Sequence, residues 1–143
     1  MVKLLDSSAE TRIVQALREA ESGSSGEIRV YVKRGASKEV FSDGKRTFHR
    51  LGMHRTKDRS GVLIFVAWKS RNFSIMGDEG IHRKVGDSFW NETRDRMQAE
   101  FLQGELLKGI LAGVTSAGVA LKKHFPRAAQ DKNELPDTLT QGD

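Results

Sequence analysis

The sequence has no cysteine, only two prolines and no long apolar run. Without cysteine the chain forms no disulfide, has no thiol nucleophile and offers no thiolate to zinc. The longest weakly polar stretch, residues 109–121, is too short to span a bilayer. The chain reaches Asp6 before any apolar region of useful length develops, so we recognise no secretory signal and expect a cytoplasmic protein.

The remaining composition is that of a soluble globular domain. The chain has 143 residues, of which 37% are hydrophobic and 30% are charged. This length is typical of a single domain with one core. The last helical pattern ends at Phe125-Pro126, so we expect one α/β domain over residues 1–126 and a polar C-terminal tail over residues 127–143.

Positive charge is concentrated in the middle of the chain. Residues 29–71 contain twelve Lys or Arg against three acids, whereas the net charge of the whole chain is +5. Such a segment is suited to an anionic partner, or it is a solvated cationic helix face, because the charges are dispersed. Nucleic acid is not favoured as a partner, since no recognised DNA- or RNA-binding motif accompanies the charge.

Three segments have strand patterns. Residues 61–67 form an apolar run rich in β-branched and aromatic residues, which predicts a strand buried on both faces. After a polar turn, residues 72–76 alternate apolar and polar, so the two segments predict an antiparallel hairpin. Residues 27–33 also alternate, and the helical pattern of residues 38–51 follows them. The strands at 27–33 and 61–67 are therefore expected to be parallel, joined by a right-handed crossover in an α/β fold.

Further helices are predicted on both sides of these strands. Ser7-Ser8-Ala9-Glu10 has the pattern of a capping box and starts the first helix. Asp87 or Ser88 is expected to cap a second long helix. A third helix, over residues 105–124, contains several glycines, each of which costs about 1 kcal/mol relative to alanine. Those glycines indicate that another element packs closely against this helix.

An acidic segment follows the hairpin. Gly77-Asp78-Glu79-Gly80 places two carboxylates between two glycines, in what we interpret as a loop at the edge of the sheet. In the hairpin arrangement the residues before the second strand meet this loop, and four carboxylates converge, those of Asp58, Asp78, Glu79 and Asp87. Carboxylate oxygens suit Ca²⁺ or Mg²⁺. The alternative is that the loop acids are ordinary turn residues and the last of the four caps the next helix.

Arg59 and Ser60 lie at the same edge and have two interpretations. Arg59 can bind a phosphate bidentately, or it can pair with Asp58, Asp78 or Glu79 and lock the loop without an ion. Ser60 has no motif that ties a histidine or carboxylate to it, so the sequence does not predict a serine nucleophile.

Trp68 ends the strand at residues 61–67, beside basic residues of the turn. It is predicted either to stack on a partner or to pack in the core.

The order of several motifs resembles the TPM domain, found in thylakoid-lumen acid phosphatase and photosystem II repair proteins. The motifs are SGEIRVYV, LGMHRTKDRSGVLIFVAWKSRNFSIMGDEGI, VGDSFW, GILAGV, HFP and NELPD. The similarity is greatest to short, stand-alone bacterial members and runs over residues 7–136. It implies a Rossmann-like α/β/α sandwich with a small mixed central sheet.

The resemblance implies less about function. Family members include acid phosphatases, binders of calcium or other divalent metals, and partners in membrane-protein repair. Many carry two aspartates and a glycine before the second strand and another aspartate after the third. Here Arg59 and Ser60 stand in place of the paired aspartates, Gly61 is retained, and Asp87 matches the later one.

The sequence therefore favours a binding or adaptor module that acts with a protein or membrane-associated partner. In this module either a Ca²⁺ or Mg²⁺ ion or the side chain of Arg59 stabilises the acidic loop. The alternative is a metal-assisted acid phosphatase of low specificity.

Overall fold

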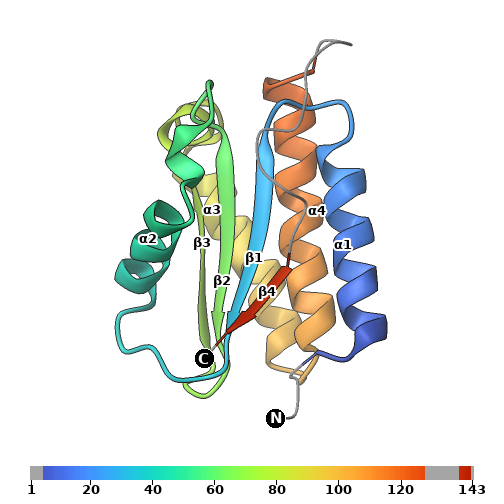
Figure 1. Ribbon diagram of the computed structural model, residues 1–143, viewed down its shortest axis with the longest axis vertical. Helices are drawn as coiled ribbons and strands as arrows, with labels where there is room; N and C mark the ends of the chain where they lie inside the picture. The colour runs from blue at the N-terminus through green and yellow to red at the C-terminus, as the bar shows by residue number, and fades with distance from the viewer. Residues whose placement is uncertain (1–4, 128–138, 143) are drawn as a thin grey trace.

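A mixed sheet with the strand order β3-β2-β1-β4 forms the middle layer of the computed structural model, which describes residues 5–127 and 139–142 (Figure 1). The strands are β1 (Glu27–Lys33), β2 (Gly61–Ala67), β3 (Asn72–Gly77) and β4 (Leu139–Gly142). β1 pairs in parallel with both β2 and β4, and β2 pairs antiparallel with β3. The structure thus confirms the predicted parallel pair and the predicted hairpin.

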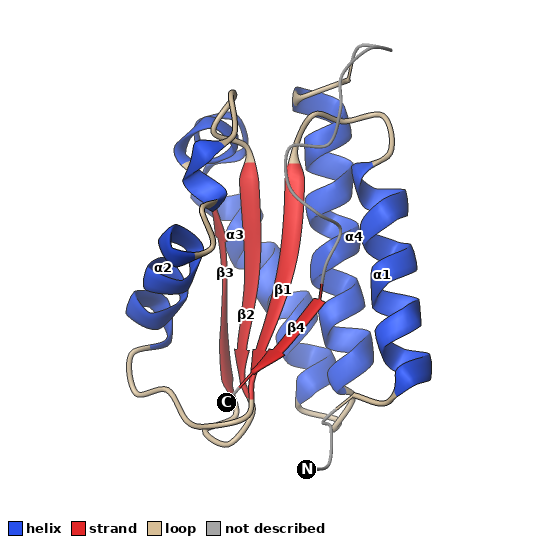
Figure 2. Ribbon diagram, in the orientation of Figure 1, coloured by secondary structure: helices blue, strands red, loops and turns tan. Residues whose placement is uncertain are grey.

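Helices cover both faces of the sheet (Figure 2). Helix α2 (Val40–Arg50) packs on one face, with the short 3₁₀ helix η1 (Met53–Arg55) after it. On the other face lie α1 (Ser7–Glu21), α3 (Glu79–Phe101) and α4 (Leu106–His124). This arrangement confirms the α/β/α sandwich predicted from the sequence.

Strand β2 is buried along its whole length because it has a core on each side. Val62, Ile64 and Val66 pack toward the larger core beneath α1, α3 and α4. Leu63 and Phe65 alternate with them and pack toward α2. The unbroken apolar run in the sequence follows from this double burial.

The glycines of α4 lie where neighbouring elements approach closely. A Cβ at Gly109 would lie 2.2 Å from the Phe101 ring of α3, and one at Gly118 would lie 2.6 Å from the Cβ of Ala20 in α1. Close helix packing, predicted from the glycines, is therefore found against two different helices.

The start of α1 and the C-terminal tail differ from the sequence predictions. Helix α1 is capped by Asp6, whose Oδ1 accepts a hydrogen bond of 2.8 Å from the N–H of Ala9, so the cap lies before the expected box. Residues 139–142, placed in the polar tail, form β4 and extend the sheet beside β1. The four residues of β4 have no strand pattern of their own, and β4 forms only by pairing with the edge of β1. Residues 128–138 and 143 of the predicted tail lie outside the described residues.

Within residues 5–127 and 139–142, no helix has the length and apolar character needed to cross a bilayer.

Candidate functional site

The acidic segment predicted to be a loop is the N-terminus of α3, and the loop prediction is wrong at this point. Asp78 is the N-cap, and its Oδ1 accepts a hydrogen bond of 2.8 Å from the N–H of Glu79, the first helical residue. Aspartate is among the preferred N-cap residues because its oxygen satisfies an otherwise free backbone N–H. The helix is interrupted at Gly86, where φ is 75°, and its second part starts beside Asp87.

Arg59 joins the start of β2 to this helix. Its Nε donates to Asp78 Oδ2 at 2.6 Å and its Nη2 donates to Asp78 Oδ1 at 2.9 Å, which makes a bidentate ion pair. A third nitrogen, Nη1, lies 3.5 Å from Glu79 Oε1. The side chain of Asp78 is only 8% exposed, whereas that of Arg59 is 41% exposed. The hydrogen bonds to Asp78 raise the pKa of Arg59.

The backbone joins the same two elements. The N–H groups of Gly80 and Ile81 both donate to the carbonyl of Arg59, at 2.9 and 3.3 Å. A Cβ at residue 80 would lie 2.0 Å from the carbonyl oxygen of Asp58, so only glycine fits there. Arg59 itself has φ 53°, a left-handed conformation unusual for a long side chain. We call Asp58, Arg59, Asp78 and Glu79 the amino-end site, because it lies at the amino end of β2.

The remaining predicted residues do not join this ion pair. Asp58 is exposed and accepts a hydrogen bond of 3.3 Å from Ser25 Oγ. Ser60 is 0% exposed, and its N–H donates to Thr56 Oγ1 at 3.1 Å. The side chain of Asp87 is 89% exposed, and its Oδ1 lies 3.6 Å from Nε2 of His82. The structure therefore brings Asp78 and Glu79 to Arg59 and leaves Asp58, Ser60 and Asp87 outside the pair.

Among residues 5–127 and 139–142, no three His, Asp or Glu side chains are placed to hold a metal ion together. Both oxygens of Asp78 already accept hydrogen bonds from Arg59. As placed, Asp58, Asp78, Glu79 and Asp87 do not give a cation a shared set of ligands. Binding of Ca²⁺ or Mg²⁺ at these residues stays a prediction.

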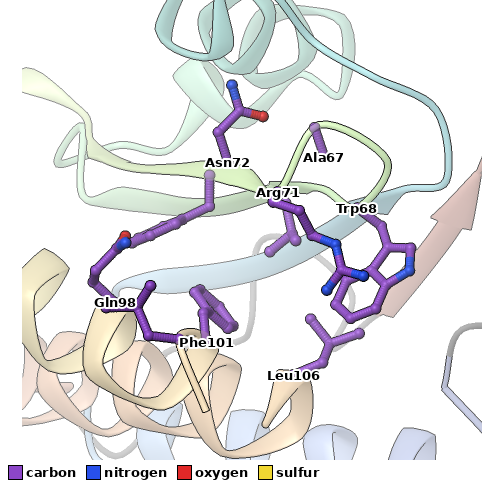
Figure 3. A pocket seen from close by; sticks show the side chains of 10 residues that line it. Ala67, Trp68, Arg71, Asn72, Gln98, Phe101 and Leu106 are labelled. Atoms are coloured by element: carbon purple, nitrogen blue, oxygen red, sulfur yellow. The ribbon is translucent and has the colours of Figure 1, made fainter. Parts of the chain in front are cut away.

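The opposite end of the sheet has a feature that the sequence analysis missed. A pocket of about 250 Å³ lies between the β2–β3 turn and the α3–α4 connection. Trp68, Arg71 and Phe101 are among its lining residues (Figure 3). The lining residues come from β2, β3, α3, α4 and the connections between them, so no single stretch of the sequence indicated a pocket. Trp68 was the only lining residue that the sequence analysis singled out. Ligands of open α/β sheets bind beyond the carboxyl ends of the strands, which is where this pocket lies.

Residues 1–120 match the TPM domain. The chain belongs to the TPM domain family. This membership agrees with the resemblance seen in the sequence motifs and covers all the described helices and strands except β4 and the end of α4.

Solved structures of other proteins share the fold. The NMR structure of the BA42 protein from the psychrophilic bacterium Bizionia argentinensis is 42% identical, covers 99% of this chain and 98% of its own, and superposes with a TM-score of 0.90. The N-terminal domain of a P. gingivalis protein is 20% identical with a TM-score of 0.71, over 87% of this chain and 83% of its own.

The N-terminal domain of the cg2496 protein from Corynebacterium glutamicum is 15% identical, with a TM-score of 0.66 over 90% of this chain and 82% of its own. At these two lower identities the likeness shows the fold alone. No curated protein sequence matched the chain.

Proposed function

We propose that this TPM domain is a binding or adaptor module whose amino-end site contacts a protein or membrane-associated partner. The bidentate pair between Arg59 and Asp78 carries the proposal, because it holds the start of β2 and the N-terminus of α3 as one unit. A surface fixed before binding loses less conformational entropy when the partner docks. In this domain an arginine supplies the positive charge that a cation would supply to the same carboxylate.

Charged side chains around this fixed unit are accessible. The side chain of Glu79 is 56% exposed and lies 3.2 Å from Nη2 of Arg83, which is 72% exposed. Asp87 and Asp58 are also exposed. Exposed charges at the rim of an interface steer association and select partners more than they add affinity. The amino-end site therefore has a fixed ion pair between Arg59 and Asp78, with exposed charged side chains around it that a partner can contact.

A phosphatase using the same residues has less support. The Ser60 side chain is fully buried, so its hydroxyl does not face a substrate in solution. Asp78 is engaged by Arg59, so its carboxylate is not free to act as a base or to bind a metal while the pair holds. We expect no turnover of an aryl phosphate above background, with or without Mg²⁺. Turnover that the Asp78→Asn variant abolishes would favour the phosphatase.

Site-specific photo-crosslinking tests the binding proposal. A photoreactive residue is placed at Glu79 in one variant and at Asp95 in a control, since both positions are exposed acids of α3. In the native host, the Glu79 variant is expected to give a crosslinked product of defined mass that the Asp95 variant does not give. Charge reversal by Arg83→Glu in the Glu79 variant should reduce that product. Equal products from both positions would contradict a binding surface at the amino-end site.

A further inference from the structure

The pocket at the carboxyl ends of the strands has one charged side chain among its lining residues, Arg71. The other lining residues are apolar or neutral, and Trp68, Phe73 and Phe101 supply aromatic surface. Phe73 and Phe101 pack edge to face with centroids 4.8 Å apart, which gives one wall a fixed shape. Leu102, at the rim, is 76% exposed, so apolar surface continues from the pocket to solvent.

Arg71 is held over the pocket in an unusual backbone conformation. Its φ is 57°, and among the described residues only Arg59 shares a positive φ without being glycine. Its N–H donates to the carbonyl of Trp68 at 3.1 Å, which closes the β2–β3 turn. Glycine or asparagine would adopt this conformation with less strain. The chain therefore has an arginine where the turn alone favours glycine or asparagine.

The guanidinium of Arg71 lies over the Trp68 ring, 4.2 Å from its centroid. Figure 3 shows the two side chains stacked, with Leu106 and Phe101 on the side of the pocket toward the helices. Stacking uses the flat face of a guanidinium and leaves the N–H groups at its edge available. No carboxylate in the described part of the chain pairs with Arg71, whereas Arg59 has Asp78 as its partner.

The neighbouring Asn72 does not compete for a ligand. Its Nδ2 donates to the carbonyl of Ser37 at 2.9 Å, and its Oδ1 accepts from Ser70 Oγ at 2.6 Å. These bonds fix the turn that carries Arg71. The guanidinium of Arg71 is therefore held in position beside the apolar space of the pocket.

The size and chemistry of this space define a ligand class. A cavity of about 150 Å³ with apolar walls binds benzene, and this pocket of about 250 Å³ has room for a ring and a short chain. A guanidinium edge binds a carboxylate bidentately. We propose that the pocket binds a small aromatic monocarboxylate, with the carboxylate on Arg71 and the ring between Trp68, Phe101 and Leu106.

Titration with 3-phenylpropanoate, followed by ¹H–¹⁵N spectra of the full chain, tests this site. We expect saturable shifts at the indole N–H of Trp68 and the Nε–H of Arg71, with the amino-end site unchanged. The neutral amide, 3-phenylpropanamide, should bind about tenfold more weakly or worse, because a hydrogen bond to a charged group is lost.

Matched variants separate the role of Arg71 from general charge. Arg71→Gln is expected to weaken binding of the acid about tenfold or more, and Leu102→Ala should weaken it several-fold without affecting the fold. Lys69→Gln removes the same charge from the same exposed turn but does not line the pocket, so it should bind as the wild type does. If the acid binds no better than the amide, if Arg71→Gln binds it normally, or if millimolar acid shifts no pocket signal, the proposal is overturned.

Discussion

At the scale of residues, the two arginines with positive φ define the two ends of the sheet. Arg59 pairs with Asp78, the N-cap of α3, whereas the guanidinium of Arg71 lies over the ring of Trp68. The sequence indicated that Arg59 has three acids within reach, and it did not decide among them. The N-cap geometry makes Asp78 the partner of Arg59, because the hydrogen bond from the Glu79 N–H holds the Asp78 carboxylate at the start of the helix.

Asp78→Ala removes both the helix cap and the partner of Arg59. Loss of an N-cap costs about 1 kcal/mol, and the variant also leaves Arg59 without its bidentate acceptor. We expect urea unfolding to show a stability loss of at least that size. Asp78→Asn, which retains the capping oxygen but not the charge, should lie between this variant and the wild type.

Asp87→Ala is the matched control for this test. Its side chain is 89% exposed, so the change in the free energy of unfolding should stay within about 0.5 kcal/mol. Equal stability of the two alanine variants would show that the pair at Asp78 does not stabilise the start of α3.

At the scale of elements, the sequence pattern predicted those helices and strands whose contacts repeat along a single segment. The apolar run of β2, the alternation of β1 and the glycines of α4 each reflect contacts that repeat along one element. The beginning of α3 was missed because residues 79–85 have little apolar periodicity and Gly86 interrupts the helix. β4 was missed because its four residues join the sheet only through an edge that β1 provides.

Gly118→Ala tests the close packing of α1 against α4. The new Cβ would lie 2.6 Å from the Cβ and 2.9 Å from the Cα of Ala20, so backbone must move. Overpacking of this kind costs about 1–3 kcal/mol, which outweighs the gain of about 1 kcal/mol from helix propensity. Thermal unfolding should therefore show a less stable variant. Val119→Ala, at the exposed neighbouring position, should change little, and a Gly118→Ala protein more stable than the wild type would refute close contact.

Gln141→Ala tests how β4 is held. The side chain of Gln141 accepts from the N–H of Leu5 at 3.1 Å and donates to the carbonyl of Leu5 at 3.3 Å, tying the end of the chain to its beginning. Loss of these bonds should cost about 1–2 kcal/mol and speed hydrogen exchange along β1. Thr140→Ala, next on the strand, serves as the control. Unchanged exchange in β1 for the Gln141 variant would mean that the strand is held by backbone pairing alone.

At the scale of the whole molecule, the two ends of the parallel strands differ in chemistry. In Figure 1 the arrows of β1 and β2 point downward. The amino-end site lies at the amino end of β2, and the apolar pocket lies beyond its carboxyl end. The positive charge predicted for residues 29–71 gathers partly on α2, where Lys45, Arg46, His49 and Arg50 line a shallow depression. Family membership gives the fold, and the two ends of the sheet carry the two candidate sites of this chain.

We propose that Arg59 takes the place of a cation at Asp78. The Arg59→Asp variant tests it, because it frees Asp78 and puts a carboxylate in place of the guanidinium that contacts Asp78 and Glu79. Carboxylate oxygens are the hard donors that Ca²⁺ prefers. Aspartate also tolerates the left-handed conformation at this position better than arginine. Arg83→Asp is the matched control, since it makes the same charge change beside Glu79 without freeing Asp78.

The deciding measurement is a CaCl₂ titration of these three proteins, followed through the backbone amide shifts of residues 77–87. We expect millimolar Ca²⁺ to leave the amide shifts of the wild type and of Arg83→Asp unchanged and to move those of Arg59→Asp saturably. Saturable shifts in the wild type, or none in Arg59→Asp, would contradict the claim that an arginine occupies the place of the ion.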